Sequence, residues 1–202
     1  MIFRSIVGVM FVAAAQLITP TNTAAAEDNS HSFPDGKQMS VIDNIEGIDQ
    51  VARAKVALMP SSFMFRVALT EGGLWGFGCP FVTGDPSRVR RLVDILRQAD
   101  IDVVEPTEVG WMGEPREGVS LVLSDGTEVQ FFFTINFVNA GVRGYFYYGV
   151  DFYGRHYLTA KSTLPDELIA WGVGIGASIP NNLPPDQLTR VKPACDHFIK
   201  LR

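Results

Sequence analysis

Few of the residue types that carry chemistry occur in this chain, which has three histidines and two cysteines among 202 residues. Their spacing gives neither the C-x-x-C nor the H-x-x-x-H pattern that is typical of a zinc site. No serine stands in the G-x-S-x-G motif of serine hydrolases. We therefore expect no metal site and no cofactor, and the sequence names no catalytic residue.

A phosphate-binding glycine motif is also missing. Gly76 and Gly78 form a G-x-G, but Phe81 stands where the third glycine of G-x-G-x-x-G is required. No P-loop motif occurs either. The glycines therefore indicate a tight turn beside Cys79 rather than a dinucleotide site.

The chain has fewer positively charged than negatively charged side chains. The chain has 17 Lys and Arg against 22 Asp and Glu, a formal net charge of −5 and a pI of about 5.2. Nucleic-acid binding needs clustered Lys and Arg, so a nucleic-acid partner is disfavoured. The one basic cluster falls on a single predicted helix, where a solvated face is expected and anion binding is the alternative. It consists of Arg88, Arg90, Arg91 and Arg97.

The apolar run at the N-terminus, residues 6–15, is shorter than the roughly 20 apolar residues needed to span a bilayer. Arg4 precedes it, and an A-x-A site, Ala24 to Ala26, follows it. This order is typical of a secretory signal peptide. We predict a signal peptide over residues 1–26, a flexible lead-in over 27–38, and export to the periplasm or the medium. No stable membrane anchor is expected after cleavage.

The two cysteines, Cys79 and Cys195, are predicted to form one disulfide, because a lone pair in an exported chain is most simply interpreted in this way. Two free thiols are the alternative. The bond would join the last helix to the first third of the exported domain.

Two local signals are clear in residues 39–202. Asp85 and Pro86 are an N-cap and a first helical residue, and the apolar positions that follow at helical spacing predict a helix to about residue 99. Asp125 and Gly126 predict the turn of a hairpin between strands 119–123 and 128–138. Further strands are predicted at 142–150 and 155–160.

Other segments give weaker signals. Residues 40–58 favour a short helix followed by a strand, 63–70 a strand, and the glycine-rich passage from Gly72 a second strand or an extended loop that ends near Val82. Helices are predicted from residue 163 into the glycines at 172–176, and from 185 onward with a kink at Pro193. Leu188 and Ile199 are expected on the inward face of that last helix. We predict one α+β domain, with a central antiparallel meander sheet of four to six strands packed by about three helices.

An aromatic band in residues 142–157 is the remaining unusual feature. Along one strand the side chains alternate, so one aromatic set cannot share the core face with the other. The set outside the core is expected to contact a partner, or, in the alternative, to be covered by a second layer. The candidate binding residues are Tyr145, Tyr147, Tyr153 and Tyr157.

These observations favour an exported, non-enzymatic binding protein of the inhibitor or toxin-neutralising (immunity) kind, with a protein partner. A small exported hydrolase with a dispersed active site, using His156 with Asp151 or other carboxylates, is one alternative. A structural accessory protein of the cell envelope is another.

Overall fold

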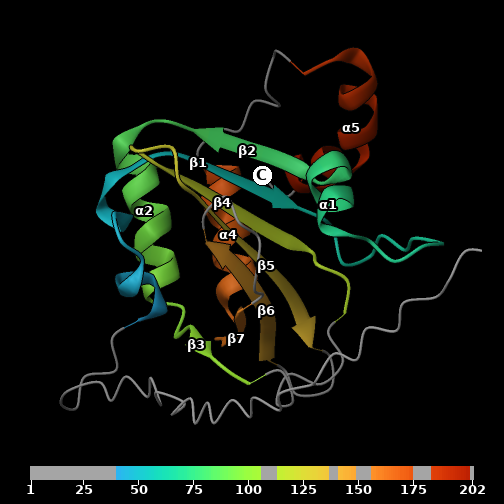
Figure 1. The fold of residues 1–202 in the computed structure, drawn as a ribbon. Helices are drawn as coiled ribbons and strands as arrows, with labels where there is room; N and C mark the ends of the chain where they lie inside the picture. Colours follow the sequence, from blue (N-terminus) through green and yellow to red (C-terminus); the bar gives the residue numbers. More distant parts are fainter. Residues whose placement is uncertain (1–39, 106–112, 137–140, 149–155, 175–182, 201–202) are drawn as a thin grey trace, which may run out of the picture. The chain divides into compact units, whose positions relative to one another are not determined.

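A seven-stranded antiparallel sheet lies at the centre of this protein (Figure 1). The computed structural model describes residues 40–105, 113–136, 141–148, 156–174 and 183–200. Across the sheet the strands follow the order β2-β1-β4-β5-β6-β7-β3. Their bounds are β1 (Val51–Leu58), β2 (Cys79–Thr83), β3 (Asp102–Val103), β4 (Glu117–Leu123), β5 (Glu128–Asn136), β6 (Gly141–Tyr148) and β7 (His156–Ala160).

Four α-helices accompany the sheet in the described ranges. They are α1 (Glu71–Phe77), α2 (Pro86–Arg97), α4 (Leu164–Gly174) and α5 (Pro185–Ile199), and two short 3-10 helices, η1 (Val41–Asn44) and η2 (Ile48–Gln50), precede β1. The predicted single α+β domain with an antiparallel sheet is therefore confirmed. The sheet has seven strands rather than four to six, because β2 and the two-residue β3 extend its edges.

Helix α2 begins where the sequence places it. The Asp85 carboxylate accepts hydrogen bonds from the backbone N–H groups of Ser87 and Arg88, each at 3.0 Å, and Pro86 occupies the first turn. These bonds satisfy donors that a helix N-terminus otherwise leaves free. The β4–β5 hairpin is confirmed as well, with Asp125 Oδ1 accepting from the Thr127 N–H at 2.8 Å and Gly126 at a φ of 90°.

The segment between β1 and β2 differs from the prediction. Residues 63–70 form no strand, and most of the glycine-rich stretch that follows is helix α1; only its end, from Cys79 on, is a strand, β2. Thr70 caps this helix, since its hydroxyl oxygen accepts from the Gly73 N–H at 3.1 Å. Leu74 anchors the helix because its side chain is fully buried. The apolar alternation in residues 63–69 was misleading, since Met64 and Val67 are exposed.

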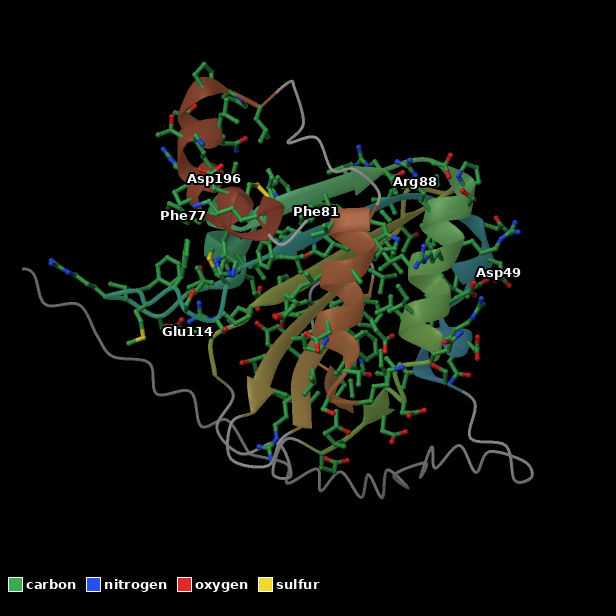
Figure 2. The ribbon with its side chains drawn as sticks, turned by 180° about the vertical axis from the view of Figure 1, so that it is seen from behind. Asp49, Phe77, Phe81, Arg88, Glu114 and Asp196 are labelled. Atoms are coloured by element: carbon green, nitrogen blue, oxygen red, sulfur yellow. A yellow bond between two sulfur atoms is a disulfide. The ribbon has the colours of Figure 1, made fainter. Side chains whose placement is uncertain are left out.

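Helices α2 and α4 cover the inner face of the sheet, and Figure 2 shows α4 in front of the strands from that side. Phe131 and Phe133 of β5 are fully buried on this face. Trp171 of α4 donates its indole N–H to the Arg88 carbonyl oxygen of α2 at 3.0 Å, which joins the two helices. Burying each of these aromatic side chains contributes a few kcal/mol, so this layer is the main core.

The outer face, opposite α2 and α4, is covered in part by α1. Trp75 of α1 packs edge-on against Phe132 of β5, with ring centroids 5.8 Å apart. A Cβ on Gly118 of β4 would stand 3.1 to 3.2 Å from Leu74 and Trp75, so glycine at this position lets the helix approach the sheet. Helix α1 therefore forms a second layer over part of the sheet.

The Cys79–Cys195 disulfide is confirmed, and it joins the edge strand β2 to α5 across 116 residues of sequence. Helix α5 continues through Pro193 and contacts both α1 and β2. Leu188 and Ile199, which were expected to face inward, are exposed. No helix within the described ranges is both long and apolar enough to cross a membrane.

Candidate functional site

A cavity of about 410 Å³ opens on the outer face of the sheet and is the first candidate site. Its floor is formed by β1, β4 and β5, and its walls by α1, β2 and the first half of α5. Small-molecule sites commonly occupy 300 to about 1,000 Å³, so the cavity is large enough for a ligand. We call it the outer-face pocket; its lining residues are Arg53, Lys55, Trp75, Gly76, Pro80, Val82, Ser120, Val122, Glu128, Leu183, Gln187 and Val191.

Two cations from β1 line the pocket floor. Arg53 and Lys55 are two residues apart on one strand, so both point to the same face, about 7 Å from each other along the strand. The strand register sets Lys55 opposite Ser120 of β4 and opposite Val82 of β2. Neither cation forms an ion pair with a residue in the described part of the chain.

A carboxylate on β5 is held rigidly beside these cations. Glu128 Oε1 accepts two hydrogen bonds, from the Ser120 hydroxyl at 2.6 Å and from the Gln130 amide at 2.8 Å. Two donors on one oxygen fix the carboxylate against the sheet. The Ser120 hydroxyl donates to this carboxylate, which is a weaker base than histidine, and no histidine lines the pocket.

Lys55 contacts an aromatic ring instead of a carboxylate. Its Nζ lies 4.4 Å from the centroid of the Trp75 ring, within the range of a cation–π interaction. Burial lowers the pKa of Lys55, and repulsion from Arg53 lowers it further, while the Glu128 carboxylate acts in the opposite direction. The ammonium group is therefore partly desolvated and lacks an anionic partner in contact with it.

The rest of the pocket wall is largely apolar. Pro80 and Val82 of β2 form one side, and Leu183 and Val191 contribute from the α5 side. The Trp75 indole nitrogen is buried and has no hydrogen-bond partner among the described residues. The pocket thus combines an apolar wall with a floor that carries two positive charges and one negative charge. This arrangement suits binding an ionised group attached to an apolar body.

The tyrosines that the sequence nominated lie elsewhere. Tyr145 and Tyr147 are only 7 % exposed, because Phe132 packs against both rings and the Tyr147 hydroxyl donates to Glu71 of α1 at 2.9 Å. The exposed aromatic surface expected at these two positions is therefore not found. Tyr157 is half-buried, and Tyr153 lies outside the described residues. A binding role for these tyrosines stays a prediction.

His156, the candidate of the hydrolase alternative, is exposed at the start of β7. Its ring stacks on Phe146 with centroids 4.9 Å apart. Asp151, its suggested partner, lies outside the described residues. Within the described ranges no histidine accepts a hydrogen bond from a serine, and no cluster of three metal-ligating side chains occurs.

Two basic residues of α2, Arg90 and Arg97, line a small hollow of about 100 Å³ together with Asp49. Arg97 pairs with Asp43 at 2.7 Å and with Asp49 at 2.8 Å, so it joins α2 to the segment before β1. The other three members of the cluster are exposed, as expected for a solvated helix face: Arg88, Arg90 and Arg91.

The sequence did not single out the cations of the outer-face pocket. Arg53 and Lys55 alternate with small apolar residues in 52–58, which indicated a strand but not its neighbours. Glu128 and Gln130 lie two residues apart on β5, so both point to this face. Only the pairing of β1 with β4, which are separated by almost sixty residues of sequence, brings these polar groups together.

A second feature is the exposed apolar loop, residues 61–69. Met64 is 91 % exposed and Val67 is 80 % exposed. Arg116 anchors the start of the loop, since its guanidinium group donates to the carbonyl oxygens of Pro60 and Phe63 at 3.3 and 2.8 Å. The exposure of the two apolar side chains is therefore fixed by the fold of the loop.

Glu117 is a third unusual group. It lies at the start of β4 on the inner face, where it is fully buried and its Oε2 has no partner among the described residues. Burial raises the pKa of Glu117 to about 8, the Asp166 carboxylate adds to the increase, and Arg116 opposes it.

Comparison with protein-family models, curated proteins and solved structures found no match. The functional conclusion therefore depends on the sequence and on the geometry of the described residues.

Proposed function

We propose that this chain is an exported binding protein that holds a ligand in the outer-face pocket. One observation carries the proposal: Arg53 and Lys55 lie side by side at a cavity, Lys55 is partly desolvated, and neither forms an ion pair with any described residue. Two unpaired cations next to each other are mutually destabilising. A ligand that supplies a negative charge would offset this repulsion.

Export is supported by two independent features. The N-terminal 26 residues have the order of charged, apolar and small residues that is typical of a signal peptide. The Cys79–Cys195 disulfide is of the kind that forms and persists in oxidising compartments. The same bond holds α5 against β2, and α5 supplies one wall of the pocket. The proposed compartment and the proposed site are therefore linked through one covalent bond.

Binding is favoured over catalysis by the hydrogen bonds of the pocket. A nucleophilic serine is usually activated by a histidine, whereas Ser120 donates to a carboxylate, a weaker base that also accepts from Gln130, and no histidine lines the pocket. The polar groups at the floor are arranged to hold charge.

The proposal is tested with a small-molecule screen of the mature protein, residues 27–202, followed by NMR. We expect compounds that shift the backbone amide signals of Lys55, Ser120 and Glu128 as one set, because these residues share the pocket floor. The amide of Arg97 on α2 lies on the other side of the sheet and serves as the internal reference. A screen in which no compound at millimolar concentration moves this set would contradict the proposal.

A second candidate function is protein binding through the exposed apolar loop, as expected for an inhibitor or an immunity-type protein. Exposed apolar patches on soluble proteins tend to mark contact sites, and Met64 and Val67 are more exposed than any other large apolar side chain described. The loop is held by Arg116, so its surface is preorganised for contact.

This second candidate predicts that Met64→Asp with Val67→Asp abolishes stoichiometric capture of a partner from the native exported fraction. Two charges placed in a desolvated contact would typically reduce affinity at least a hundredfold. Leu188→Asp is the matched control, since Leu188 is an exposed leucine on α5. Equal capture by the wild type and the loop variant, with the same partner, would rule this surface out.

A further inference from the structure

We infer that the ligand of the outer-face pocket is a monoanionic carboxylic acid with a flat apolar body. This inference rests on the proposed function, and it names the chemical class that the site selects. It follows from the charge count at the floor, the hydrogen bonds already made there, and the composition of the walls.

The charge count gives the sign and the size of the ligand charge. Arg53 and Lys55 contribute two positive charges and Glu128 one negative charge, so the pocket carries a net charge of +1 in a chain whose net charge is −5. A carboxylate neutralises this excess, whereas a phosphate monoester brings about two charges. Arg53 and Lys55, about 7 Å apart along β1, can approach one carboxylate from two sides.

The existing hydrogen bonds argue against a cationic ligand. A ligand ammonium or amidinium would have Glu128 as its one anionic partner in the pocket lining, and one oxygen of this carboxylate, Oε1, already accepts from Ser120 and Gln130. It would also lie beside Arg53 and Lys55, both of which would repel it. An anion instead gains two donors that bind no described carboxylate. It would also raise the pKa of Lys55, which burial has lowered.

The walls set the shape of the rest of the ligand. Val82, Leu183 and the Trp75 side chain supply apolar surface around the cations. Lys55 lies over the Trp75 ring, so a carboxylate bound at Lys55 places its attached body beside this aromatic group. A flat hydrocarbon framework makes the largest contact with such a wall.

The test uses three probes of nearly equal shape: 2-naphthoate, 2-naphthamide and 2-naphthamidinium, with charges of −1, 0 and +1. Binding is measured by NMR titration at pH 7, followed at the Trp75 indole signal and the Lys55 amide. We expect 2-naphthoate to bind at least about tenfold more tightly than the amide, since charge-assisted hydrogen bonds exceed neutral ones by this margin or more. The amidinium should bind most weakly.

Two double variants locate the source of the preference. Arg53→Gln with Lys55→Gln is expected to remove the advantage of naphthoate over naphthamide while both probes still enter the pocket. Arg90→Gln with Arg91→Gln on α2 removes the same net charge at exposed positions and should leave the preference unchanged. An equal loss in both variants would mean that the preference arises from overall charge, and it would overturn the inference.

The failure of the inference is distinguishable from that of the proposed function. If naphthamide or naphthamidinium binds at Lys55 as tightly as naphthoate, the pocket is a binding site but its ligand is not an acid, so only the inference is overturned. If none of the three probes moves the Trp75 or Lys55 signals and the screen also yields no compound at the pocket, both are overturned.

Discussion

Replacing Cys79 and Cys195 together with alanine is expected to lower the free energy of unfolding by about 5 kcal/mol. The bond closes a loop across 116 residues, and a loop of this length restricts the unfolded chain strongly. Urea denaturation of the mature wild type and of the double variant measures the difference. Part of the loss comes from packing, since the Cys195 side chain is fully buried at the α5–β2 contact. The wild type reduced with dithiothreitol, which keeps both sulfur atoms, isolates the contribution of the bond itself.

The same variant should also bind the ligand more weakly than the wild type under conditions in which the variant is still folded. Val191 and Gln187 of α5 line the outer-face pocket, and the disulfide holds α5 against the edge strand. A double variant whose free energy of unfolding lies within about 1 kcal/mol of the wild-type value would show that the bond constrains the unfolded chain only a little.

Glu117 is expected to make the protein less stable as the pH rises from about 4.5 to about 8. Its pKa is about 8 in the folded protein, against an ordinary value of 4.5, because burial disfavours the charged carboxylate. The folded state therefore retains a proton that the unfolded state has released, so folding loses stability as the pH rises through this window and is not affected further above it. A shift of this size corresponds to about 5 kcal/mol in total.

The measurement is urea denaturation of the wild type and of Glu117→Gln at several pH values between 4 and 9. The amide has nearly the same shape as the protonated acid and does not titrate, so the variant should gain stability over the wild type with rising pH, most strongly at pH 8 and above. Glu114→Gln is the matched control, because Glu114 pairs with Arg116 near the protein surface. Parallel pH profiles for the wild type and Glu117→Gln would show that the buried carboxylate is not the source.

The elements that the sequence predicted correctly have local causes. Helix α2 is specified by Asp85 and Pro86, and the β4–β5 hairpin by Asp125 and Gly126, in each case through contacts within a few residues. The disulfide was predictable for a different reason, since two cysteines in a chain that is predicted to be exported allow one intramolecular pair.

The elements that were missed depend on tertiary contacts. Helix α1 contains three glycines and has weak helix propensity, but Leu74 and Trp75 pack against Gly118 of a strand far along the chain. The same helix covers part of the outer face, where Trp75 packs on Phe132 and Glu71 bonds Tyr147. The sequence showed more aromatic residues than one core face holds, yet it did not show that α1 provides a second covered layer.

The pocket could not be predicted from the sequence for a related reason. Arg53 and Lys55 come from β1, Glu128 from β5 and Trp75 from α1, and no motif joins these positions. These residues come together because of the strand order β2-β1-β4-β5, which places β4 between β1 and β5. Strand order over such sequence distances is not encoded in local patterns.

The most direct test of the outer-face pocket as a ligand site compares Gly76→Trp with Gly72→Trp. Both glycines lie on α1, and a Cβ at either meets nothing within 4 Å, so both variants are expected to fold. Only Gly76 lines the pocket, where an indole side chain would fill much of the cavity. The tightest-binding naphthyl probe is titrated into each variant by NMR. We expect Gly72→Trp to bind as the wild type does and Gly76→Trp to show no binding, whereas unchanged binding in Gly76→Trp would contradict the proposed site.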